Sequence, residues 1–231
     1  MPKPTAGRKV LFMDIDNCLY SKSLDIQILM GDLIDDYFQT HLELTRQDAF
    51  DLHKKYYQEY GLAIKGLVLN HHVDALDFNA KVDDALPLED ILEPNPQLRK
   101  LLEDIDTAKV KLWLLTNAYK THGMRVVKLL GIDDLFEGIT YCDYGAEVFL
   151  AKPQEEMWVK AMKEAQVESK EDCYFVDDSY LNAAASQRYG WTTAHLIEPS
   201  EKKLPRTPAS AHQIRSLEEL RTIFPDFFKT S

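Results

Sequence analysis

The sequence predicts an α/β protein with a doubly wound parallel sheet and a small all-helical domain inserted after the first strand. Short continuous apolar runs, typical of strands buried on both faces, alternate with amphipathic helical patterns over most of the chain. One long segment breaks this rhythm, because it contains several helical patterns and no strand-like run. We therefore expect an α/β core built from residues 1–16 and 94–231, and a helical cap built from residues 17–93.

The core is predicted from its alternation of strands and helices. The strand-like runs are residues 10–13, 110–115, 138–141, 173–176 and 192–196. The helical patterns among them are residues 119–130, 154–165 and 180–189. Asn95-Pro96 also has the form of an N-cap followed by the first residue of a helix. Residues 198–211 are polar and contain proline, so we expect a loop there, followed by a last short helix capped by Ser216.

The predicted cap is helical because its apolar residues recur at helical spacing. Leu29, Leu33 and Tyr37 are four residues apart. Thr45, with an aspartate three residues later, has a capping-box pattern, and Gly61 is placed to end the helix that follows. Two shorter helical stretches complete the segment.

The charge balance excludes some classes of partner. Among 231 residues, Asp and Glu number 38 and Lys and Arg 27, which gives a net charge of −11. An acidic surface repels polyanions, so we expect no nucleic acid polymer and no membrane as partner. No apolar run reaches the about 18 residues of a spanning helix, and we find no signal peptide. Three widely spaced cysteines predict no disulfide framework, and we expect a cytoplasmic protein, in the nucleus as well in some settings, that is a monomer or weak dimer.

Polar side chains follow four of the predicted strands, where ligands bind in open α/β sheets. They are Asp14, Asp16, Thr116, Asn117, Lys152, Asp177 and Asp178. Four carboxylates at one edge would repel each other, and a hard cation with oxygen ligands relieves that repulsion. Mg²⁺ fits, because it binds a few carboxylates and keeps positions for water and a phosphate oxygen.

The types and spacing of these residues point to phosphate chemistry. Asp14 and Asp16 are two positions apart, so one acid can attack phosphorus while the other transfers protons. The Thr116 hydroxyl and the Asn117 amide suit phosphate oxygens, and Lys152 supplies a positive charge between nucleophile and phosphate.

The motifs DIDNCLY, LLTNAY, AKPQ and FVDDS resemble, in that order, the four motifs of the haloacid dehalogenase superfamily of phosphohydrolases. The segments YYQEYGLAIKGL, VDDALPLEDIL and GITYCDY are similar to the pyrimidine 5′-nucleotidase branch, particularly its fungal-type members, over most of residues 10–200. Asn17 and Cys18 depart from the Gly and Thr that many superfamily members carry after the second acid, but this pair is compatible with the nucleotidase branch.

The resemblance implies a role for each matching residue. Asp14 would be the nucleophile that forms an aspartyl-phosphate, and Asp16 would protonate the leaving oxygen and then activate water. Thr116 would bind the phosphoryl group and Lys152 would neutralise it. The implied Mg²⁺ ligands are Asp14, the backbone carbonyl of Asp16, Asp178, and Asp177 either directly or through one water.

The expected function is a Mg²⁺-dependent phosphomonoesterase acting on small nucleotides such as UMP or CMP. Within the cap, Tyr60, His71 and His72 are the candidates for contact with the substrate. The alternatives are a phosphatase of another small metabolite (a sugar phosphate, a pyridine mononucleotide or a lysophospholipid), a phosphomutase with the same core motifs, and a silenced binding protein on this scaffold. Silenced proteins typically lose the nucleophile or the proton-transfer acid, and both are present here.

Overall fold

The computed structural model describes residues 7–201 and 204–230 and confirms the predicted parallel sheet. Six strands pair in the order β3-β2-β1-β4-β5-β6, and every pair is parallel. The strands are β1 (Lys9–Met13), β2 (Val110–Leu115), β3 (Gly138–Thr140), β4 (Cys173–Asp177), β5 (Thr192–Leu196) and β6 (His212–Ile214). The first five match the predicted runs. Strand β6 was not predicted. It is an edge strand of three residues, of which only Ile214 is buried.

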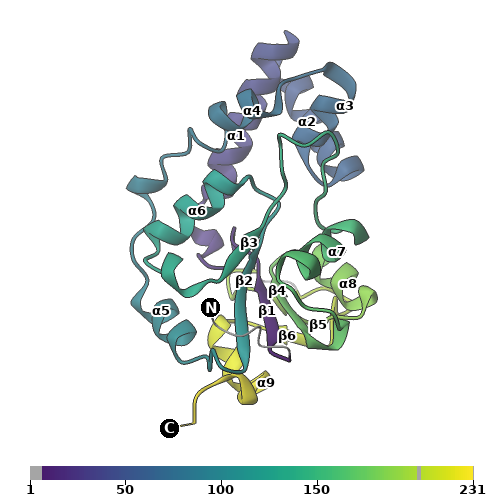
Figure 1. The fold of residues 1–231 in the computed structure, drawn as a ribbon. Coiled ribbons are helices and arrows are strands. Elements are labelled where there is room, and N and C mark those ends of the chain that lie inside the picture. The colour runs from purple at the N-terminus through teal and green to yellow at the C-terminus, as the bar shows by residue number, and fades with distance from the viewer. Residues whose placement is uncertain (1–6, 202–203, 231) are drawn as a thin grey trace.

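Helices cover both faces of the sheet, as a doubly wound fold requires (Figure 1). The helices of the core are α5 (Pro96–Glu103), α6 (Lys120–Leu129), α7 (Glu155–Glu164), α8 (Tyr180–Tyr189) and α9 (Leu220–Ile223). Helices α5, α6 and α9 pack on one face and α7 and α8 on the other. Strand β1 shows the division directly, because Leu11 and Met13 belong to the first hydrophobic cluster whereas Val10 and Phe12 belong to the second. This alternation follows from the two-residue period of a strand.

Short 3₁₀ helices connect several of these elements. They are η1 (Lys22–Leu24), η2 (Leu88–Asp90), η3 (Asp133–Leu135), η4 (Lys170–Asp172), η5 (Leu217–Glu219) and η6 (Pro225–Phe227). The predicted caps form as expected. The Asn95 side chain accepts a hydrogen bond from the Leu98 amide at 3.0 Å, and Ser216 forms a capping box with Glu219 at the start of η5.

The segment between β1 and α5 is helical. It contains α1 (Ile26–Leu42), α2 (Arg46–Tyr60), α3 (Ala63–His71) and α4 (Ala75–Lys81). We call this segment the helical insert. Thr45 caps α2 by accepting from the Asp48 amide at 3.2 Å, and Gly61 ends α2 in the left-handed region with φ 78°. Both features were predicted.

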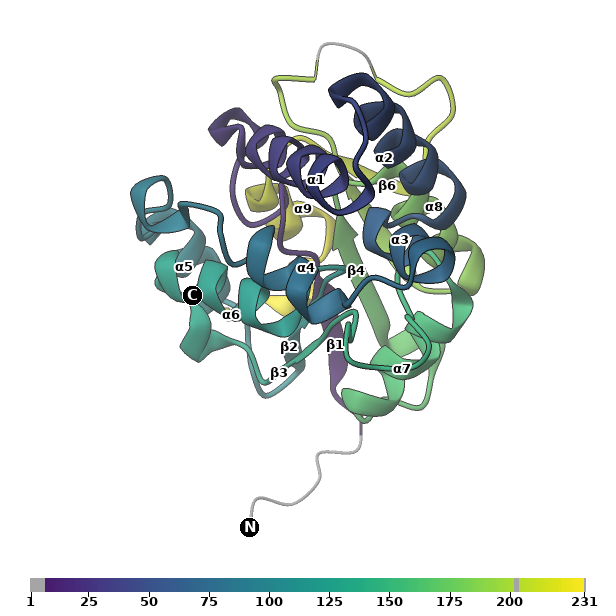
Figure 2. The same cartoon turned by 90° about the horizontal axis from the view of Figure 1, so that it is seen from above.

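The helical insert has its own hydrophobic cluster, which includes Phe38, Tyr56 and Leu67. Figure 2, which views the molecule from above, shows α1–α4 lying over the end of the sheet. The segment after β3 also joins this cluster through Cys142 and Phe149. The insert therefore packs against the core through a loop that lies far from it in sequence. Among the described residues, no helix is long and apolar enough to cross a membrane.

Candidate active site

Asp14 lies immediately after β1 and is 7% exposed. Its amide donates to the Val176 carbonyl at 3.0 Å, which extends the pairing of β1 with β4 by one residue. Its carboxylate Oδ1 accepts from Lys152 Nζ at 2.6 Å. The strand therefore fixes the backbone of Asp14 at the carboxyl edge of the sheet, and the lysine fixes one oxygen of its side chain.

Lys152 is a buried cation with all three of its ammonium protons used. Its side chain is 1% exposed, and Nζ donates to Asp14, to Asp177 Oδ2 at 2.8 Å and to the Leu115 carbonyl at 2.8 Å. Burial alone would lower the pKa of Lys152, but the two carboxylates raise it above its usual value. The Asn117 side chain holds the backbone of this lysine, since its Oδ1 accepts from the Lys152 amide at 2.7 Å and its Nδ2 donates to the Lys152 carbonyl at 2.9 Å. The backbone amide of Asn117 and the second N–H of its Nδ2 are left for phosphate.

A carboxylate cluster stands beside this lysine. One oxygen each of Asp14, Asp177 and Asp178 lie within 4.8 Å of one another. Burial raises the pKa of Asp14 well above its usual value, and the other two carboxylates add to the rise while Lys152 opposes it. Burial and Asp177 likewise raise the pKa of Asp178 to about 6. One lysine does not neutralise three carboxylates, and the donor set fits a hard divalent cation such as Mg²⁺.

The two adjacent aspartates of this cluster are held differently. Asp177 Oδ1 accepts from the Ser179 amide at 2.7 Å, and Asp177 Oδ2 accepts from Asn182 Nδ2 at 3.1 Å as well as from the lysine. Asp178 is paired through Oδ2 with Lys22 Nζ at 3.0 Å. Both oxygens of Asp177 are thus engaged by protein donors, which favours Asp178 as the more available ligand.

Asp16 is also held by two donors that the sequence analysis did not single out. Its Oδ1 accepts from Tyr20 Oη at 2.7 Å and lies 2.8 Å from His122 Nε2. Burial pushes the pKa of Asp16 up, but the charge and hydrogen bond of His122 and the hydroxyl of Tyr20 lower it below its usual value. Burial likewise disfavours charge on His122, yet Asp16 and Asp83 outweigh it and raise the pKa of His122 to about 9.

These residues meet in one cavity of about 200 Å³ at the carboxyl edge of the sheet. Of the predicted core residues, Asp14, Asp16, Thr116, Asn117, Lys152 and Asp178 all line it. Asp177 lies behind the wall, where it is fully buried. The Thr116 hydroxyl oxygen accepts from the Ala118 amide at 3.0 Å, so its proton is free to point to a ligand.

The structure places the three predicted cap residues outside the lining of this cavity. Tyr60, His71 and His72 are not among the residues that line the cavity. Tyr60 packs against Tyr56 on the same helix, and His71 Nε2 lies 2.6 Å from the Tyr56 hydroxyl. His72 ends α3 in an exposed position. The insert instead contributes Gln27, Tyr57, Gly61 and Leu62 to the cavity.

Sequence reasoning could have found part of what it missed. His122 lies on the otherwise apolar face of α6, four residues before Val126, and a polar residue on an apolar face is a signal for a buried partner. Tyr57 gave no such signal, because tyrosines also stand one position before it and three after it on the same helix. Only the packing of α2 decides which ring faces the cavity.

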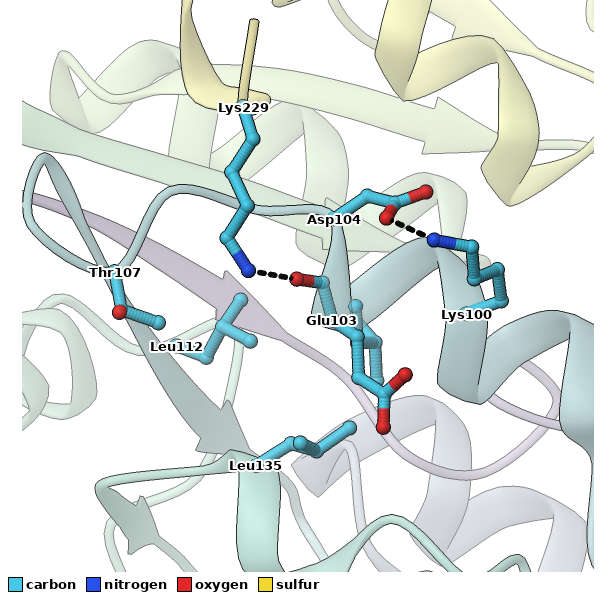
Figure 3. Close-up of a pocket in the computed structure, with 8 residues that line it drawn as sticks. Lys100, Glu103, Asp104, Thr107, Leu112, Leu135 and Lys229 are labelled. Atoms are coloured by element: carbon cyan, nitrogen blue, oxygen red, sulfur yellow. Dashed lines mark hydrogen bonds and ion pairs between the residues drawn. The ribbon is translucent and has the colours of Figure 1, made fainter. Parts of the chain in front are cut away.

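A second cavity, of about 430 Å³, lies beside β2 and α5, away from the carboxylate cluster (Figure 3). Its lysines are already bound to protein groups, since Lys229 Nζ donates to the Glu103 carbonyl and Lys100 pairs with Asp104. It therefore offers no free cation to a phosphate. The carboxylate cluster remains the candidate active site.

The fold and the site together define the chain as an α/β enzyme of the hydrolase class. Residues 8–190 match the model of the haloacid dehalogenase-like hydrolase family, and the chain belongs to that family. This confirms the family resemblance seen in the motifs.

The chain is also similar to individual proteins. Phosphate metabolism protein 8 of Saccharomyces cerevisiae is 42% identical over 207 residues, which are 86% of this chain but only 64% of the yeast protein. Glyceraldehyde 3-phosphate phosphatase of Methanocaldococcus jannaschii is 22% identical over 96% of this chain and 99% of its own length. The crystal structure of a phosphatase of the same family from Thermococcus onnurineus superposes with a TM-score of 0.63 at 20% identity, over 94% of this chain and 97% of that one. At this identity the superposition shows the fold alone.

Proposed function

We propose that the chain is a Mg²⁺-dependent phosphomonoesterase that hydrolyses small nucleoside 5′-monophosphates through an aspartyl-phosphate on Asp14. The observation that carries the proposal is the pairing of Asp14 with a fully buried lysine, 2.6 Å away, in a cavity that Asp16 also lines. The lysine opposes the rise in the pKa of Asp14 that burial causes, and it supplies positive charge where a phosphoryl group would meet the carboxylate.

The residues present support a two-step reaction. Asp14 attacks phosphorus, the ester P–O bond breaks, and Asp16 gives its proton to the leaving alkoxide. Asp16 then takes a proton from water, whose oxygen attacks phosphorus and breaks the bond to Asp14, so inorganic phosphate leaves and both acids return to their starting states. Thr116 and the Asn117 amide would bind phosphoryl oxygens. Mg²⁺ held by Asp14, the Asp16 carbonyl and Asp178, with Asp177 directly or through water, would neutralise charge on the phosphoryl group.

The nucleotide substrate rests on the motif resemblance and on the insert residues at the cavity. The Tyr57 ring offers a stacking surface to a base, and the Gln27 amide can both donate and accept hydrogen bonds. The cavity volume favours a second candidate. At about 200 Å³ it is smaller than the roughly 300–1,000 Å³ usual for ligand pockets, and a triose or sugar phosphate needs less room than a nucleotide.

Steady-state kinetics over a panel of esters distinguishes these candidates. The panel contains UMP, CMP, glyceraldehyde 3-phosphate, a hexose phosphate, a pyridine mononucleotide and a lysophospholipid, each assayed with Mg²⁺. We expect the highest kcat/KM for a pyrimidine nucleotide. A sugar or triose phosphate preferred by about 100-fold would replace the nucleotide as substrate, while leaving the phosphatase proposal intact.

Two tyrosine variants test the base contact. Tyr57→Ala should raise KM for the nucleotide about 10-fold, since the loss of one stacked ring costs about 1–3 kcal/mol. Tyr60→Ala, three residues along the same helix but outside the cavity, is the matched control and should leave KM unchanged. The opposite pattern would restore the sequence-based expectation for Tyr60.

A further inference from the structure

We propose that Tyr20 and His122 are positioning residues that bind Oδ1 of Asp16, so that Oδ2 is the oxygen that exchanges the proton with the leaving group and with water. This rests on the proposed phosphatase function. It goes beyond that function by assigning the proton transfer to one atom. It also gives a role to Tyr20, the last residue of the DIDNCLY motif, and to His122, which lies outside the four motifs.

Asp16 Oδ1 is the carboxylate oxygen that both residues contact. It accepts from the Tyr20 hydroxyl at 2.7 Å and from His122 Nε2 at 2.8 Å. A carboxylate oxygen has two in-plane lone pairs, and these two donors use both of them. A proton placed on Oδ1 would face two other hydrogens, so the proton that Asp16 carries belongs on Oδ2.

The other carboxylate oxygen of Asp16, Oδ2, lies in different surroundings. Within residues 7–201 and 204–230, no group donates a hydrogen bond to Oδ2. Since Oδ2 is also not among the fully buried polar atoms without a partner, it is accessible from outside the protein. The Asp16 side chain is 25% exposed and lines the cavity, whereas His122 is fully buried. The free oxygen is therefore the one that reaches the substrate side.

Both donors are fixed by different parts of the fold. His122 lies on α6, packed against the same sheet face as Ile15. Tyr20 is 6% exposed and belongs to the stretch that leads from β1 into the helical insert. A carboxylate bound from two such directions is held in place at Oδ1. This spares the reaction the cost of orienting its acid.

The test uses esters that differ in how much they need an acid. An alkyl phosphate such as UMP or ribose 5-phosphate has a poor leaving group, whereas p-nitrophenyl phosphate leaves without protonation. The parameter is kcat/KM with Mg²⁺, because it covers the steps up to departure of the leaving group and is independent of the later hydrolysis of the intermediate.

We expect His122→Leu and Tyr20→Phe to lower kcat/KM for the alkyl esters by about 100-fold and about 10-fold respectively. Neither loss exceeds the ~10²–10⁴-fold that a general acid contributes. The loss for p-nitrophenyl phosphate should stay within about 3-fold, because that ester does not need the acid. His122→Gln, whose amide can replace the Nε2 donor, should recover most of the loss.

Matched controls remove similar pairs from the insert. Tyr37→Phe removes a hydroxyl bonded to Asp77 at 2.9 Å, and His53→Leu removes a contact to Asp35 at 2.8 Å. Both should keep wild-type kinetics. Equal losses on alkyl and aryl esters, or no loss in folded Tyr20→Phe and His122→Leu proteins, would overturn the assignment. A wild-type protein inactive on every ester would instead overturn the proposed function.

Discussion

Asp83 is a buried carboxyl group that forms no ion pair with residues 7–201 or 204–230. It is 3% exposed, and its Oδ2 has no hydrogen-bond partner among the described residues. Burial, the largest influence, raises its pKa to about 6, although His122 opposes the rise. Because the pKa in the folded state lies above that of the unfolded chain, the folded state binds the proton more tightly.

The free energy of unfolding should therefore fall as the pH rises from about 4 to about 6. Below about pH 4 the group is protonated in both states and costs nothing, and above pH 6 the folded state carries a buried charge at a cost of about 3 kcal/mol. Urea unfolding from pH 4 to 7 should show Asp83→Asn gaining about that much relative to wild type as the pH increases. A difference between Asp83→Asn and wild type that does not change with pH would contradict the raised pKa.

The convergence of the core residues was predictable because they follow the strand ends of a regular fold. Asp14, Thr116 and Asp178 follow strand ends, so their convergence follows from the parallel sheet alone. The cap residues were not predictable in this way. Tyr57 reaches the cavity, and Tyr60 does not, because of the rotation of α2 about its own axis, which tertiary packing sets.

At the scale of the elements, α2 and α3 cross closely at Gly66. A Cβ placed there would lie 2.3 Å from the Tyr56 ring. Gly66→Ala should therefore destabilise the protein by about 1–3 kcal/mol through overpacking, even though alanine favours a helix by about 1 kcal/mol. In α1, by contrast, a Cβ at Gly31 meets nothing within 4 Å, so Gly31→Ala should stabilise by up to about 1 kcal/mol. Chemical unfolding measures both changes, and the same sign for the two would contradict the close crossing.

Element boundaries followed from sequence wherever a local signal marks them. Strands β2 and β5 and helix α8 begin and end where the apolar runs and Gly190 place them. Strand β6 carries no such signal, because three residues at the edge of a sheet need only one partner strand and one buried side chain. Pairing with β5, not its own sequence, makes this segment a strand.

For the whole molecule, the net charge of −11 and the carboxylates of the site affect different kinds of partner. The surface charge bears on polymers and membranes, whereas the site has three clustered carboxylates, two of which line the cavity, beside one lysine. Binding of Mg²⁺ at this cluster should stabilise the folded state, by about 2.7 kcal/mol when its concentration is 100 times the dissociation constant. Thermal melts with and without Mg²⁺ measure the effect.

The control for that effect is NaCl at the same ionic strength, which screens the surface charge without binding the cluster. Asp178→Asn should reduce the rise in Tm caused by Mg²⁺, and EDTA should abolish phosphate release by the wild-type protein. A rise in Tm that NaCl reproduces, or that Asp178→Asn retains in full, would argue against a metal site at the cluster.

The central claim is that phosphate passes through Asp14, and trapping the enzyme during turnover tests it most directly. The protein is mixed with a substrate labelled with ³²P in the phosphoryl group, quenched in acid within the first turnovers and digested for peptide mapping. The claim predicts label on the peptide that contains Asp14, and predicts that Asp14→Asn, folded by its melting curve, carries no label and turns over about 10⁴-fold more slowly or worse. Release of phosphate at the wild-type rate by Asp14→Asn, or label on a different residue, would contradict it.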